Sequence, residues 1–129
     1  MDIPGIRQAL VDAAVAAVPA LHGYPYVPQS PELPCIYCGP PAYDDWSFNT
    51  QASVELVLTL CVSRADETVA EQLLDKYAST GAIQIGVTNA PRTFWVDVAV
   101  GPVDNTRAAS FGESIQVLAV DHHFSLRTK

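Results

Sequence analysis

The stretch WSFNTQASVELVLTLCV, residues 46–62, decides the fold of this 129-residue chain. Its even positions are nearly all apolar and its odd positions mostly polar, a period of two that predicts a β-strand with one buried face. At about 3.3 Å per residue the strand would span roughly 55 Å, more than the roughly 36 Å diameter of a compact domain of this length. Two compatible interpretations follow: the strand bends near Thr50–Ser53, or its first half projects as an arm.

Two helices are predicted on either side of this strand. In Ile3–Val18 the apolar residues recur at three- and four-residue spacing, and Asp2 is placed to cap the helix. Ala65–Ala78 repeats the pattern, with Gly81 as the expected terminator. Residues 82–88 fit either a helical turn or a short strand, and both alternatives stay open.

Further strands are predicted at Cys35–Gly39, Thr93–Val103 and Ser114–Leu126, with a polar loop at Asp104–Glu113. The last strand is apolar on both faces near its middle, which is typical of a central position in a sheet. Residues 1–129 are therefore predicted to form one α+β domain. It has a mostly antiparallel sheet of about four strands, two helices packed on one face and a long protruding β-hairpin.

Composition excludes several classes of protein. The chain has 14 acidic and 7 basic residues, a formal charge of -7, and no Lys or Arg between Arg7 and Arg64. Nucleic acids and anionic membrane surfaces both require clustered cations, so neither is an expected ligand. Apolar residues make up 49% of the chain and charged residues 16%, which argues against disorder. No apolar run reaches the length of a membrane span.

The cysteines and histidines do not form a recognisable metal site. Cys35 and Cys38 have the CxxC spacing, but a second pair is missing and Cys61 stands alone. His122 and His123 are adjacent in a predicted strand, so they point to opposite faces. Buried thiols are therefore expected rather than a zinc or redox centre, and an odd number of cysteines suits a reducing compartment.

No catalytic constellation emerges from the remaining residues. Asp44 and Asp45 form a like-charge pair, an arrangement that can raise one carboxyl pKa and supply an acid, but their position at a Gly/Pro turn indicates a solvated loop tip. Signature motifs for nucleotide binding, serine hydrolysis and zinc proteolysis are absent from the sequence. The chain is expected to be no enzyme, with no cofactor and no metal.

A pattern of turns and strand ends extends over most of the chain. It comprises YPYVP at Tyr24–Pro28, a strand from Pro34 that ends at Gly39-Pro40, an acidic-aromatic turn at Asp44–Phe48, and VSRAD at Val62–Asp66 leading directly into a helix. This pattern resembles the tail terminator proteins of bacteriophages with long, non-contractile tails. The chain departs from it after Gly81, where relatives often have a longer helix.

The resemblance implies a structural protein of the virion. Such proteins form a hexameric ring on the end of the tail tube, stop its growth and join it to the head-completion or stopper proteins. The implied partners are further copies of this chain, the tail tube protein and a head-completion protein, with DNA passing through the ring unbound. The implied location is the head–tail joint, after assembly in the host cytoplasm.

The residues themselves nominate a contact surface. Two aromatics lie on the apolar face of a strand that is too long for its own domain, and an exposed apolar edge normally needs a covering partner. The candidate interface residues are Tyr43, Asp44, Asp45, Trp46 and Phe48. Two alternatives remain: another neck protein of the head-completion or stopper kind, or a small ligand-binding or enzymatic α+β domain.

Overall fold

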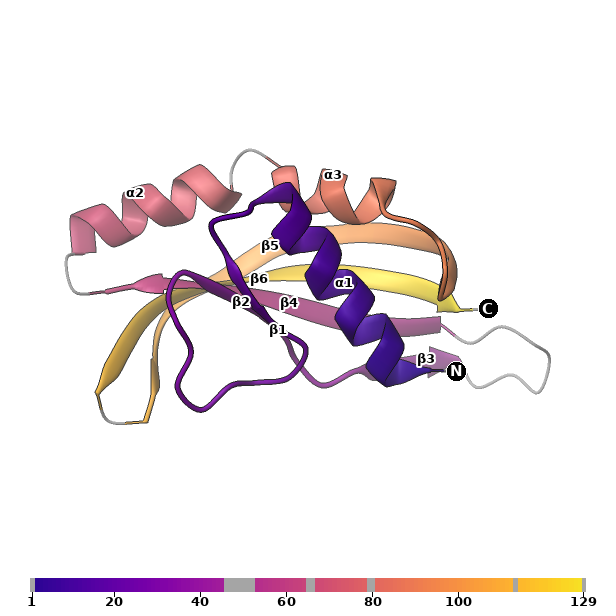
Figure 1. The fold of residues 1–129 in the computed structure, drawn as a ribbon, viewed down its shortest axis with the longest axis horizontal. Coiled ribbons are helices and arrows are strands. Elements are labelled where there is room, and N and C mark those ends of the chain that lie inside the picture. The colour runs from indigo at the N-terminus through magenta and orange to yellow at the C-terminus, as the bar shows by residue number, and fades with distance from the viewer. Residues whose placement is uncertain (1, 46–52, 65–66, 79–80, 113, 129) are drawn as a thin grey trace.

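The computed structural model describes residues 2–45, 53–64, 67–78, 81–112 and 114–128. These residues form three helices and six strands (Figure 1). In chain order they are α1 (Ile3–Ala17), β1 (His22–Tyr24), β2 (Cys35–Cys38), β3 (Ala42–Asp45), β4 (Ser53–Ser63), α2 (Glu67–Ala78), α3 (Ala82–Asn89), β5 (Trp95–Phe111) and β6 (Ile115–Thr128).

All strands belong to one sheet with the order β1-β2-β4-β6-β5, and β3 pairs with β4 beside β2. The α+β class and the mostly antiparallel sheet are confirmed; only β1 and β2 run parallel. The sheet has more strands than the four expected, because β1 and β3 lie in stretches whose glycine, proline and aspartate residues favour turns. Residues 82–88, left open between helix and strand, belong to a third helix, α3.

The first helix begins as its sequence predicts. A carboxylate oxygen of Asp2 accepts a hydrogen bond from the backbone N–H of Gly5 at 3.0 Å, which satisfies one of the free donors of the first turn. Arg7 is buried although it is charged. Its guanidinium donates to the carbonyls of Pro25 and Cys38 at 3.1 and 3.0 Å, so it fastens α1 to β2 and to the proline-rich segment.

The even positions of β4 lie in the main core, as the period of two predicts. Val54, Leu56, Leu58, Leu60 and Val62 are fully buried and pack with residues from all three helices. All 11 residues of β4 pair with β6, which confirms β6 as a central strand. The helices therefore cover one face of the sheet, and a smaller apolar cluster, built without helix residues, occupies the opposite face.

The predicted loop at Asp104–Glu113 is wrong, because β5 continues as a strand to Phe111. β5 has 17 residues and β6 has 14, and three irregularities in β5 absorb the difference. Each bulge shifts the alternation of side chains by one position, so no single period of two runs through the strand. Asn105 takes a positive φ of 59°, a conformation that asparagine tolerates better than most residues.

The longest hairpin is formed by β5 and β6, and its far end curves away from the helices (Figure 1). A second hairpin joins β3 to β4, with Tyr43 opposite Val54 and a register shift before Asp45. The arm or bend expected at residues 46–52 lies outside the described residues. Trp46 and Phe48 are therefore not placed.

Candidate functional site

The candidate functional surface is the face of the sheet opposite the helices, here called the open face. Within the described ranges, strands and the segment before β2 supply its side chains. It carries a polar network centred on Asp121 and, beside it, an apolar cluster. Their members on β4 and β6 occupy odd-numbered positions, which point away from the helix-covered core.

Asp121 accepts hydrogen bonds from three side chains. Thr59 Oγ1 and a guanidinium N–H of Arg107 donate to one carboxylate oxygen at 2.9 and 3.0 Å, and Asn105 Nδ2 donates to the other at 3.0 Å. Asp121 is only 8% exposed, and burial by itself raises its pKa. The three hydrogen bonds and the charge of Arg107 outweigh that cost, so the pKa of Asp121 is lowered and the carboxylate stays ionised.

The apolar cluster of the open face lies next to this network. Cys35, Cys61, Val117 and Ala119 form its buried centre. Partly exposed side chains surround them: Tyr24, Leu33, Tyr37, Ala109, Phe111 and Ile115. The rings of Tyr37 and Phe111 meet edge to face with centroids 6.0 Å apart, a favourable aromatic geometry. Large apolar side chains beside an ordered ion pair make this a surface suited to contact with another protein.

Basic side chains are mostly engaged with acidic ones. Arg127 donates a direct hydrogen bond to the carboxylate of Asp97. A guanidinium nitrogen of Arg92 lies 4.0 Å from the same carboxylate. Arg107 is held by Asp121, and Arg7 is buried between α1 and β2. His123 Nε2 lies 2.7 Å from the carboxylate of Asp104. The described cations therefore do not gather into the patch that phosphate binding requires.

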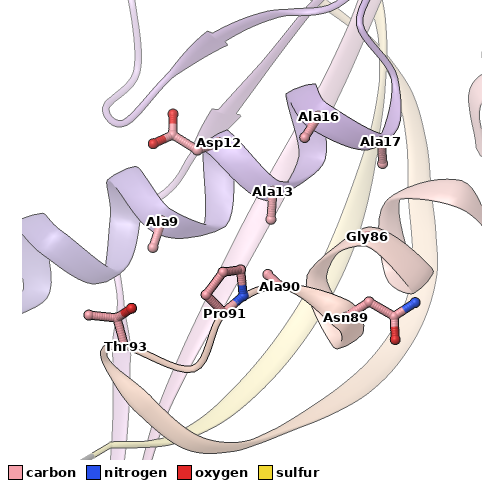
Figure 2. A pocket seen from close by; sticks show the side chains of 10 residues that line it. All are labelled: Ala9, Asp12, Ala13, Ala16, Ala17, Gly86, Asn89, Ala90, Pro91 and Thr93. Carbon is pink, nitrogen blue, oxygen red and sulfur yellow. The ribbon is translucent and has the colours of Figure 1, made fainter.

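A groove of about 520 Å³ lies between α1 and α3 (Figure 2). Alanines of α1 form one wall, while Gly86, Asn89 and the segment after α3 form the other. Asp12 is the one titratable side chain in its lining, and it accepts a hydrogen bond from Gln8 at 2.8 Å. Beside the Asp12 carboxylate, the described residues of this lining hold no second titratable group that could act with it in catalysis.

The predicted interface residues are only partly placed. Tyr43, Asp44 and Asp45 belong to β3 at the edge of the sheet, and Trp46 and Phe48 lie outside the described residues. The structure therefore brings the first three together in one strand with β4 as neighbour. Their contact with a partner stays a prediction.

The CxxC spacing does not form a site. Cys35 lies in the cluster of the open face, whereas Cys38 belongs to the core under the helices, so the two thiols are on opposite sides of the sheet. Burial raises the pKa of Cys38 to about 11, and the charge of Arg7 opposes this only in part. Among the described residues, no group of three or more His, Cys, Asp or Glu side chains is arranged to hold a metal ion.

Sequence reasoning missed the Asp121 network. Its donors Asn105 and Arg107 fell in the stretch assigned to a loop, so no partner for Asp121 was apparent. One signal was available: an aspartate in the middle of an apolar central strand needs buried partners.

Comparison with known proteins adds no family assignment: no protein-family model matches the chain, and no match to a curated protein was found. Within the described part of the chain, no helix is both long and apolar enough to cross a membrane.

Proposed function

We propose that this chain is a structural subunit of a bacteriophage head–tail joint, of the tail terminator type. It assembles as a ring of six copies on the end of the tail tube, ends tube growth and presents a surface to the head-completion or stopper protein. The order of elements implied by the resemblance supports this proposal. The structure has a first helix, two short strands, the β3–β4 hairpin, two further helices and a C-terminal pair of strands, in that order.

The observation that carries the proposal is the one-sided covering of the sheet. All three helices pack on one face, and the open face keeps six partly exposed apolar side chains around a buried centre. When one face of a sheet is covered by helices and the other faces solvent, the residues on the solvent face are usually polar. An apolar cluster on the bare face is therefore the feature of a subunit that buries it against another chain.

The long edge strand gives a second reason. β5 ends the sheet, and in the part of the chain described here no strand pairs with its outer edge. Its bulges and Pro102 limit strand addition along that edge, which favours side-chain contacts over continuous backbone pairing between subunits. Contacts of that kind suit the closed, regular geometry of a ring.

The charges suit a ring that DNA crosses without binding. Each subunit has a formal charge of -7, and its described arginines on the sheet are held by aspartates. Phosphate binding gains its free energy from counterion release at clustered cations, and such a cluster is missing from the described surface. Like charges in a lumen repel the duplex and leave it free to slide.

The test uses the full chain and its cognate tail tube protein. Tube protein is polymerised with and without this chain, and the products are compared by electron microscopy, while native mass spectrometry follows the 13.9 kDa subunit in solution. We expect shorter tubes with six-fold density at one end. A ring that docks only on head-completion proteins would instead identify a stopper. Unchanged tubes and a chain that stays monomeric in every mixture would refute the proposal.

A further inference from the structure

Two of the three cysteines face each other across the sheet. The register of β2 and β4 pairs Cys35 directly with Cys61. Their exposures are 0% and 1%, and both side chains belong to the apolar cluster of the open face. Cys38 points into the core on the other side. The thiols that the fold brings together are therefore separated by 25 intervening residues and are not those of the CxxC motif.

The spacing of this pair is within the range of a disulfide. Gly39 N–H donates to the carbonyl of Val57 at 2.9 Å, and the same register makes Cys35 and Cys61 a hydrogen-bonded pair of the ladder. Such pairs have Cα atoms about 5.5 Å apart, and disulfides span about 4.4–6.8 Å between Cα atoms. The two thiols are close enough to shift each other's pKa.

From this juxtaposition we propose that Cys35 and Cys61 form a reversible dithiol–disulfide pair, oxidised within one chain by a peroxide. A separation of about 5.5 Å lies near the commonest Cα spacing of disulfides, so the bond can form without a large shift of the backbone. The oxidised form ties β2 to the central strand β4. It closes the loop that contains β3 and the candidate interface residues.

The pKa values of the two thiols are shifted in opposite directions. The hydrogen bond from Cys61 lowers the pKa of Cys35, more than its burial raises it. The same bond, together with burial, raises the pKa of Cys61. Cys35 is therefore the thiol that ionises more readily, and the thiolate is the nucleophile in oxidation.

The reaction proceeds in two steps that balance. The Cys35 thiolate attacks one peroxide oxygen, the O–O bond breaks, and the leaving oxygen takes a proton and departs as water, which leaves a sulfenic acid on Cys35. The Cys61 sulfur then attacks that sulfur, the S–O bond breaks, and the oxygen leaves as a second water with the Cys61 proton. Two thiols are oxidised and one hydrogen peroxide is reduced. The peroxide enters when β1 and β2, of three and four residues, open locally at the sheet edge.

The experiment treats the native full-length chain with a small excess of hydrogen peroxide and then counts free thiols in denaturant. Intact mass and peptide mapping locate any bond, and dithiothreitol tests reversal. We expect wild type to lose two thiols and about 2 Da, with a Cys35–Cys61 cross-linked peptide. The matched control Cys38→Ala should lose both of its thiols in the same way, whereas Cys61→Ala should form no intrachain bond.

Three results would overturn the proposal: three free thiols retained by the wild type, a Cys35–Cys38 bond, or cross-links only between chains. Because the wild-type map alone decides among these results, a variant that fails to fold does not block the test. The outcome is also independent of ring assembly, so it leaves the proposed function untouched.

Discussion

Acidification should destabilise the fold through His122. This side chain lies on the helix-covered side of β6, opposite Leu58 of β4, and is 1% exposed. Both ring nitrogens are fully buried. Burial lowers the pKa of His122 from 6.5 to about 4; the Asp121 carboxylate and a hydrogen bond with the Leu58 backbone oppose this shift, and His123 adds to it.

The change in the free energy of unfolding with pH follows from the difference in proton binding between the unfolded and folded chains. Below pH 6.5 the unfolded chain binds a proton at His122, whereas the folded chain binds it only near pH 4. Stability is therefore lost as pH falls through that window, by about 3 kcal/mol in total and by about 2 kcal/mol at about pH 5. Asp121 does not contribute there, because its carboxyl group, with an ordinary pKa of 3.8, is ionised in both states.

Urea unfolding at about pH 7.5 and about pH 5, followed by tryptophan fluorescence, measures the difference in the free energy of unfolding. His122→Leu keeps a similar volume without a titrating group, and it should remove most of the drop between the two pH values. His22→Gln is the matched control, because the His22 side chain is 48% exposed, and it should keep the drop. An equal drop in wild type and His122→Leu, or none in wild type, would refute this reasoning.

Four further outcomes are expected, the first of them with a control variant. Asp121→Ala should lower the free energy of unfolding by about 2–3 kcal/mol because three donors lose their acceptor; Asp104→Ala, at an exposed pair, should cost less than about 1 kcal/mol by the same denaturation. Gly86→Ala should lower the melting temperature, since its Cβ would lie 2.6 Å from Cβ of Ala17, and an increase would contradict that packing. Trp46→Ala should reduce tail capping in the tube assay, and normal capping would remove this residue from the interface. Filter binding at about 50 mM salt should detect no affinity for duplex DNA, and tight, salt-sensitive binding would exclude a passive channel.

Regular elements with one buried face could be predicted from the sequence. The apolar even positions of β4 all lie in the core, and α1 begins at the Asp2 cap. These features depend on local patterns, a period of two or a capping residue three positions from its donor. β1 and β3 could not be predicted in this way, because they lie in stretches whose glycine, proline and aspartate residues locally favour turns, and they form by pairing with β2 and β4.

β5 shows why the polar network escaped sequence reasoning. A run of four polar residues, Asp104–Arg107, locally favours a loop. The pairing of β5 with β6 nevertheless continues on both sides of this run. The bulge between Asp104 and Arg107 adds a residue to β5 there, and both Asn105 and Arg107 donate to Asp121 on β6. The stabilising partner lies 14 to 16 residues further along the chain, beyond the reach of any local pattern. The bulge that interrupts the period of two in β5 therefore also shapes the Asp121 network. Without the added residue, the alternation of β5 would not bring both donors to the same carboxylate.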